Sequence, residues 1–171
     1  MEELSTRKKI YEAIVLNPGM HFRELQRFLS IPVGMLEYHL SVLEKDGLIV
    51  SKDDGRYKRY FANTTMTQEE RKIMGLLRNN ITRNIVIFLL ENGRSKHADI
   101  MRNFDISPST LSYHLNKLVK KGVVVRESIG RENYYEIRHP ETVANTIIKY
   151  RKSFLDSVVD NFAEWWLGHK K

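Results

Sequence analysis

Short polar side chains recur on one face of a predicted helix that begins at Pro108. Hydroxyls, an amide and a cation in such positions can hydrogen-bond to base edges in a groove of duplex DNA. An asparagine amide can bind adenine through two hydrogen bonds, whereas serine and threonine contact bases or phosphates. A merely solvated helix face is the alternative, but such a face usually carries more glutamate. The residues on this face are Ser109, Thr110, Ser112, Tyr113, Asn116 and Lys117.

Basic residues follow this face and are placed to bind phosphates, namely Lys120, Lys121, Arg126 and Arg131. An earlier stretch offers a comparable set, namely Tyr38, Ser41, Lys52, Arg56, Lys58 and Arg59. Residues 106–137 hold 5 basic and 3 acidic residues, whereas residues 31–62 hold 5 of each. We therefore expect the later stretch to be the main reader of DNA. The earlier stretch is expected either to bind a phosphate or a minor groove, or to contact protein instead.

The chain repeats itself when it is shifted by 75 residues. Tyr38–Leu40 then meets Tyr113–Leu115, and Gly47 meets Gly122, without a gap. Chance is a poor explanation for a match that covers a helix, a turn and a strand pair. Two copies are too few for a solenoid, so each copy is predicted to be close to a self-sufficient domain.

The first copy has the pattern of three helices followed by a β-hairpin, which is a winged helix. Asn17-Pro18-Gly19 separates the first helix from the second, and Asp53-Asp54-Gly55 is a hairpin turn. The predicted helices run from Ser5 or Thr6 to Leu16, over Phe22–Leu29 and from Pro32 to Lys45, and the strands cover Leu48–Val50 and Tyr57–Ala62.

The second copy repeats this order, with predicted helices over Ile81–Glu91, Lys96–Phe104 and Pro108–Lys121 and strands over Val123–Arg126 and Tyr134–Ile137. Thr67 and Glu70 have the spacing of a capping box, so a linker helix is predicted from there to Arg78. The predicted fold is mainly α with small β wings (α+β), with two tandem winged helix-turn-helix units. The predicted divisions are 1–65, 66–139 and 140–171.

Residues 140–167 are predicted to form one long helix with an aromatic stripe. Its apolar residues could form a ligand pocket with Trp166, pack on the second unit, or pair with the same helix of another chain. An uncovered aromatic face would promote aggregation, and helix pairs of this kind commonly form two-fold dimers. We expect a homodimer through Ile147, Tyr150, Phe154, Val158, Phe162 and Trp165.

Several function classes are unsupported by the 171 residues. There is no cysteine, which excludes disulfides and thiolate chemistry and fits a reducing cytoplasm. No metal-ligand spacing, phosphate loop or nucleophile elbow appears, so we expect no enzyme, no cofactor and no metal site. His39 and His114 recur at equivalent positions, and we expect them to support their helices rather than bind metal. The net charge of +7 fits an acidic partner such as nucleic acid.

The charged N-terminus is not expected to be a signal peptide. The longest apolar run, Ile85–Leu90, is far short of the roughly 20 residues that cross a bilayer. We therefore expect a cytoplasmic protein without membrane contact.

Two stretches carry a family resemblance: "IPVGMLEYHLSVLEKDGLIVSKDDGRYKRYF" and "ISPSTLSYHLNKLVKKGVVVRESIGRENYYEI". They resemble winged-helix regulators of the ArsR-like class, and two such units in one chain resemble archaeal tandem winged-helix transcription regulators. The resemblance covers about residues 6–62 and 81–138. It implies a sequence-specific regulator that binds double-stranded DNA. The thiolate ligands of metal-sensing members are absent, so metal sensing by that route is not implied.

Two other functions are compatible with the sequence. Tandem winged helices also serve as protein–protein interaction modules with weak, non-specific DNA binding, and the neutral first copy keeps that alternative in place. A non-specific chromatin protein is the third possibility, against which the modest charge of +7 argues.

Overall fold

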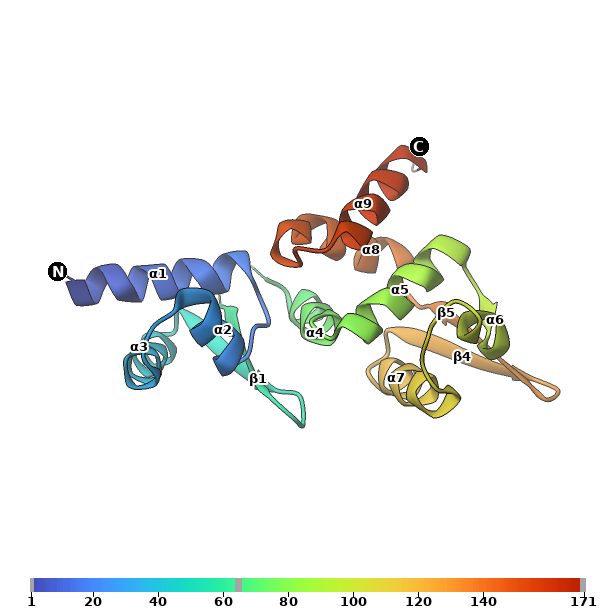
Figure 1. Ribbon diagram of the computed structural model, residues 1–171, viewed down its shortest axis with the longest axis horizontal. Coiled ribbons are helices and arrows are strands. Elements are labelled where there is room, and N and C mark those ends of the chain that lie inside the picture. Colours follow the sequence, from blue (N-terminus) through green and yellow to red (C-terminus); the bar gives the residue numbers. More distant parts are fainter. Residues whose placement is uncertain (1, 64–65, 170–171) are drawn as a thin grey trace. The chain divides into compact units, whose positions relative to one another are not determined.

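The computed structural model describes residues 2–63 and 66–169. The chain divides into two compact units, Met1–Gly75 with Lys152–Phe154, and Leu76–Arg151 with Leu155–Lys171. Each unit contains a helix-turn-helix and its own β-hairpin (Figure 1). The predicted fold class, mainly α with small β wings, is confirmed.

The first unit follows the predicted order, with α1 (Glu2–Leu16), α2 (Phe22–Leu29), α3 (Val33–Lys45), β1 (Ile49–Asp53) and β2 (Lys58–Ala62). The strands are antiparallel, with Lys52 opposite Arg59. The predicted start of α1 at Ser5 or Thr6 is wrong, because α1 already includes Glu2. The Thr6 hydroxyl instead donates to the Glu2 carbonyl oxygen (3.0 Å) inside the helix.

Local hydrogen bonds set the ends of α2. His21 precedes the helix and accepts from the Glu24 backbone N–H (3.4 Å), while the His21 N–H donates to the Glu24 carboxylate (3.2 Å). This is a capping box in which a histidine takes the usual place of serine or threonine. Ser30 ends the helix in the left-handed conformation (φ 52°). The two ends fix the short turn between α2 and α3.

An apolar core packs the three helices against the hairpin. The residues of α3 that enter it recur at helical spacing, so the opposite face of α3 stays in solvent. The main core side chains are Ile10, Ile14, Leu25, Leu36, Leu40, Leu43 and Ile49.

The predicted linker helix exists as α4 (Gln68–Leu77) and begins with the predicted capping box. The Glu70 N–H donates to the Thr67 hydroxyl (3.0 Å), and the Thr67 N–H donates to the Glu70 carboxylate (3.1 Å). A Cβ at Gly75 would lie 3.7 Å from the side chains of Arg59 and Phe61. Most of α4 therefore belongs to the first unit, and the division between units follows Gly75 rather than residue 65, which lies outside the described residues.

The second unit contains α5 (Asn80–Asn92), β3 (Ser95–Lys96), α6 (His97–Met101), α7 (Pro108–Lys120), β4 (Val124–Ile129) and β5 (Glu132–Ile137). The sheet order is β3-β5-β4, with Ser95 opposite Tyr135. β3 was not predicted, because two residues show no periodicity. α6 ends at Met101, before the predicted Phe104.

The single helix predicted over 140–167 is wrong. The segment forms α8 (Pro140–Lys149), a 3₁₀ turn (Arg151–Ser153) and α9 (Ser157–His169). Leu155 has a left-handed backbone (φ 50°), which an α-helix does not allow. Asp156 then accepts from the Val158 N–H (2.9 Å), as an N-cap does, and starts a new helix. α9 folds back against α8 and α5 (Figure 1).

Half of the predicted dimer stripe is buried. Ile147, Phe154 and Phe162 are buried, so the prediction that these three form an interface between chains is wrong. Val158 remains 44% exposed, and Tyr150 and Trp165 are partly exposed. Within residues 2–63 and 66–169, no helix is both long and apolar enough to cross a bilayer.

Candidate nucleic-acid interface

α7 presents one polar face because its opposite face is fixed in the core. Leu111, Leu115 and Leu118 are fully buried. All six side chains predicted to read bases lie on the remaining surface and are exposed or partly exposed, namely Ser109, Thr110, Ser112, Tyr113, Asn116 and Lys117. The structure therefore leaves all six side chains accessible from solvent.

The first turn of α7 is rich in hydroxyls. Ser107 is the N-cap, and its Oγ accepts from the Thr110 backbone N–H (3.2 Å). The same oxygen lies 2.8 Å from Thr110 Oγ1 and 3.1 Å from Ser109 Oγ. The positive dipole end of a helix favours an anion, so this end of α7 suits a phosphate.

A buried histidine on each of α3 and α7 hydrogen-bonds to the first helix of its own unit. His114 Nδ1 on α7 and Thr82 Oγ1 on α5 are joined by a 3.1 Å hydrogen bond. His39 on α3 accepts at Nδ1 from Arg7 Nε on α1 (3.2 Å). Burial lowers the pKa of both imidazoles, and the nearby cations Lys117 and Arg7 lower the pKa further. The expectation that these histidines support their helices is confirmed.

Sequence reasoning missed the partners of these histidines, although the repeat contains a signal for them. A shift of 75 residues aligns Arg7 with Thr82 just as it aligns His39 with His114. A polar residue at that position of the first helix of each copy is therefore the feature that identifies the partner. In the described part of the chain, no three His, Asp or Glu side chains gather as a metal site.

An open groove of about 510 Å³ lies between α6, α7 and the β4–β5 hairpin. His97 Nε2 and Ser112 Oγ are 3.1 Å apart in it, and Arg126 Nη1 donates to Asn116 Oδ1 (2.9 Å). The full lining is Lys96, His97, Ala98, Ser112, Asn116, Arg126, Arg131, Glu132, Asn133 and Tyr135. The groove thus brings together four predicted site residues from α7 and the hairpin.

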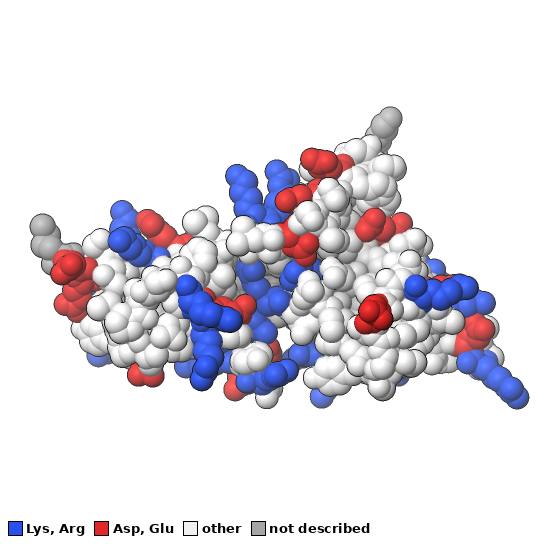
Figure 2. Space-filling view, in the orientation of Figure 1, with Lys and Arg blue, Asp and Glu red and all other residues white. Residues whose placement is uncertain are grey.

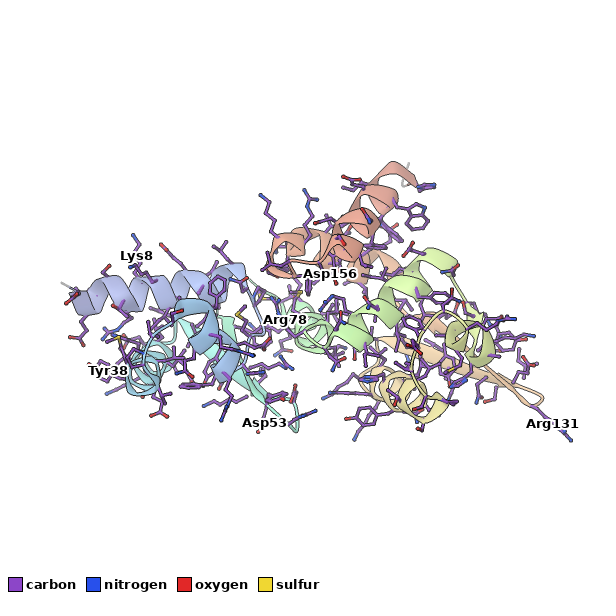
Figure 3. The ribbon with its side chains drawn as sticks, in the orientation of Figure 1. Lys8, Tyr38, Asp53, Arg78, Arg131 and Asp156 are labelled. Carbon is purple, nitrogen blue, oxygen red and sulfur yellow. The ribbon has the colours of Figure 1, made fainter. Side chains whose placement is uncertain are left out.

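The cations around this groove differ in their partners. Lys96 is paired with Glu132 (3.1 Å). Lys120, Lys121 and Arg131 are exposed and form no ion pair with any described residue. Arg131 projects from the tip of the β4–β5 hairpin (Figure 3), where Figure 2 shows basic side chains at the surface. These three cations are available to neutralise phosphates.

The first unit has an equivalent groove of about 440 Å³. Its lining is Phe22, Glu37, Leu40, Ser41, Glu44, Lys58 and Tyr60. Under the 75-residue shift, Glu37 and Ser41 take the places of Ser112 and Asn116. Lys58 Nζ lies 3.5 Å from Glu44 Oε1, so a carboxylate already balances this cation. Each unit therefore has a groove beside its exposed helix, but the side chains that line the two grooves differ in charge.

The exposed face of α3 is also less polar than that of α7. Tyr38 is 53% exposed and projects from α3 (Figure 3), with the Arg7 guanidinium carbon 5.8 Å from the centre of its ring. Val33 and Met35, which precede it on α3, are exposed as well. Ser41 is exposed, as predicted. Such a surface offers apolar area rather than many hydrogen bonds.

The predicted phosphate contact of Arg59 is wrong. Arg59 is buried, and its Nε donates to Asp54 Oδ2 (2.6 Å) while Nη1 donates to the Gly19 carbonyl oxygen (2.9 Å). Glu24 Oε1 lies 3.7 Å from Nη1. The guanidinium therefore ties the hairpin to the turn before α2. Sequence reasoning missed this role because four of the five residues of β2 are buried, so inward and outward positions do not alternate.

The other predicted cations of the first hairpin are at the surface. Lys52, Arg56 and Lys58 are exposed. Arg56 lies over the Tyr57 ring, with its guanidinium carbon 5.2 Å from the ring centre. Lys52 and Arg56 form no ion pair within the described ranges, so they remain candidates for a phosphate contact.

Comparisons with known proteins agree with the division of the chain into two units. Residues 4–74 match a family described as an N-terminal HTH domain. Residues 78–125 match a family described as winged helix-turn-helix DNA-binding. Over 147 residues, 86% of this chain, the sequence is 32% identical to an uncharacterized HTH-type transcriptional regulator of Methanocaldococcus jannaschii. The chain spans about a third (35%) of the length of that relative.

Among solved structures, the chain is similar to an ArsR family transcriptional regulator, at 20% identity and with a TM-score of 0.39. That match covers 53% of this chain and 94% of the other. A transcriptional regulator homologue from Pyrococcus horikoshii OT3 is 25% identical with a TM-score of 0.42, and the match covers 55% of this chain and 97% of the other.

Proposed function

We propose that this chain, a homologue of an archaeal HTH-type transcriptional regulator with two helix-turn-helix domains, binds double-stranded DNA at specific sequences and regulates transcription. It does so by binding alone, without catalysis. The observation that carries the proposal is the groove of the second unit. There Ser112, Asn116 and Arg126 offer hydrogen bonds beside cations that form no ion pair with any described residue.

In this proposal α7 enters the major groove, which is wide enough for one helix. Asn116 and Ser112 face base edges, and Tyr113 contacts bases or sugar beside them. Lys120, Lys121 and Arg131 bind phosphates on either side. This division of roles separates residues that choose the sequence from residues that supply affinity.

One observation favours a second candidate function for the first unit, a protein–protein interaction module with weak, non-specific DNA binding. Glu37 and Glu44 line its groove and repel phosphate, and Tyr38 and Met35 expose apolar surface on α3. In this candidate α3 meets protein while the hairpin cations Lys52 and Arg56 give at most a non-specific DNA contact.

Selection of bound duplexes from a random DNA pool, at near-physiological salt, tests the proposal. We expect a defined motif for the wild-type chain. Asn116→Ala should blur one position of that motif, whereas the repeat-equivalent variant Ser41→Ala should leave the motif unchanged. Recovery of random sequence with micromolar or weaker binding would overturn the DNA-reading proposal and favour the protein-interaction candidate.

We also propose that the chain acts as a homodimer through the residues of the predicted stripe that stay at the surface, Tyr150, Val158 and Trp165. A two-fold dimer would read an inverted repeat with half-sites about one helical turn apart. Light scattering should give twice the chain mass for the wild type and the single-chain mass for Val158→Asp. Asn161→Asp, at an exposed position of α9, is the matched control. A monomeric wild type at micromolar concentration would refute the dimer.

A further inference from the structure

Asn116 and Arg126 form one unit across the helix and the hairpin of the second domain. Arg126 Nη1 on β4 donates to Asn116 Oδ1 on α7 (2.9 Å), and both side chains are exposed. Both also line the groove beside α7. A guanidinium carries only N–H donors, so it can hold the amide only through its oxygen. The contact therefore fixes which end of the Asn116 amide turns toward Arg126.

This orientation changes what the pair offers to a DNA base. An asparagine that binds adenine uses its oxygen to accept from N6 and its NH₂ to donate to N7. Here the oxygen is already engaged, so the amide presents its two N–H donors. Arg126 contributes the remaining N–H groups of its guanidinium. The pair is thus rich in donors and poor in acceptors.

Among the bases, guanine presents two acceptors in the major groove, N7 and O6. Adenine and cytosine present an amino group that needs an acceptor, which the occupied oxygen supplies poorly. Thymine presents one acceptor only. We propose that the Asn116–Arg126 pair selects guanine at one position of the binding site, with Arg126 both orienting Asn116 and excluding adenine. This inference rests on the proposed function and replaces the adenine contact expected from Asn116 alone.

The first unit shows that the pair is not a requirement of the fold. Under the 75-residue shift, Asn116 corresponds to Ser41 and Arg126 to Ser51. Ser51 Oγ donates to Glu44 Oε2 (3.1 Å) instead of reaching α3's exposed serine. The same places in the same fold therefore carry no donor pair, so the arrangement in the second unit reflects its surface chemistry.

Duplex selection with the full chain and three variants tests the proposal. We expect guanine at one position of the wild-type motif. Both Asn116→Ala and Arg126→Met should lose that preference, by about tenfold relative to adenine, and Arg126→Met should shift it toward adenine. Arg131→Met is the matched control, because Arg131 lines the same groove but does not contact Asn116; it should weaken binding at an unchanged motif. Circular dichroism melts would show that the variants are folded.

A second experiment removes a hydrogen-bond acceptor from the DNA base instead of a donor from the protein. Replacing the selected guanine with 7-deazaguanine should weaken wild-type binding about tenfold and leave binding by Asn116→Ala and Arg126→Met nearly unchanged. Adenine at the position that Asn116→Ala blurs would overturn the guanine assignment while leaving the regulator proposal intact. Retention of guanine in Asn116→Ala alone would show that Arg126 reads without the pair. Absence of any motif would refute both proposals together.

Discussion

Asp54 and Arg59 are joined by a 2.6 Å hydrogen bond from Nε to Oδ2, inside the hairpin of the first unit. Burial alone would raise the pKa of Asp54, but the backbone N–H groups of Tyr57 and Arg56 and the Arg59 guanidinium outweigh it. Together they lower the pKa of Asp54 to about 2, from 3.8. The carboxylate is therefore part of the scaffold of the hairpin.

Replacing this carboxylate should destabilise the first unit and remove part of its acid sensitivity. A lowered carboxyl pKa adds stability above pH 3.8 that is lost as the pH falls toward 2. Asp54→Asn should therefore reduce the free energy of unfolding by roughly 2 kcal/mol at pH 7, and by much less near pH 2. Urea denaturation followed by circular dichroism measures both. Asp53→Asn, at the exposed neighbouring position, is the control, and an equal loss in both variants would contradict the role of Asp54.

The buried histidines predict a second pH dependence, in a different range. Their pKa values are lowered by burial, so the unfolded chain binds protons more readily than the folded chain once the pH falls below 6.5. The melting temperature should therefore decline between pH 7 and 5. His39→Gln and His114→Gln together should flatten this decline, because glutamine takes up no proton. The exposed His139→Gln should keep the wild-type profile; a profile unaltered in the double variant would refute the assignment.

The cations of the second unit that pair with no acidic residue in the described part of the chain predict a defined salt dependence. Log affinity falls as log salt concentration rises. Changing Lys120, Lys121 and Arg131 to glutamine should make this fall less steep, by about 0.9 in slope for each phosphate that is no longer neutralised. Binding should weaken alike for specific and random duplexes. Lys8→Gln is the control, because Lys8 lies on α1, outside both grooves and both hairpins (Figure 3). Fluorescence anisotropy titrations at several salt concentrations measure the slopes, and an unchanged slope in the triple variant would refute phosphate binding.

Arg83 and Asp156 predict how α9 is held in the second unit. Arg83 donates to Asp156 Oδ2 from Nε (3.2 Å) and Nη2 (2.9 Å), and both side chains are largely buried. Removing one partner leaves a buried charge uncompensated, so Asp156→Ala should cost about 3 kcal/mol. Both tryptophans of the chain lie on α9, so their fluorescence reports its release. Asp160→Ala, at an exposed site of the same helix, should change neither stability nor fluorescence; no difference between the two variants would refute the role of the pair.

The sequence predicts the architecture well where a physical rule links spacing to structure. Leu36 and Leu111, with their helical neighbours, identified the buried faces of α3 and α7, and Thr67 with Glu70 identified the start of α4. The helix break at Leu155 could not be predicted from the sequence, because apolar residues keep helical spacing on both sides of it. Spacing records which face is apolar and not whether the backbone is continuous.

The candidate site was predicted as a set of residues but not as a set of contacts. The exposed residues of α7 lie where their periodicity placed them. Arg126 and Asn116 come from different elements, so their hydrogen bond depends on how the hairpin packs beside the helix. Arg59 was misassigned for a related reason, since its charge suggested the surface while Asp54 and Gly19 hold it inside.

The matching grooves of the two units have a consequence for how such a protein changes over time. The core leucines of α3, Leu36, Leu40 and Leu43, recur in α7 as Leu111, Leu115 and Leu118. The groove residues Glu37 and Ser41 of α3 are replaced in α7 by Ser112 and Asn116. In the proposed function, recognition therefore depends on a few surface positions that the core does not constrain. One unit of such a repeat can acquire a new ligand by a few point substitutions while the other unit keeps the original ligand. Specialisation of the two units therefore requires no new fold.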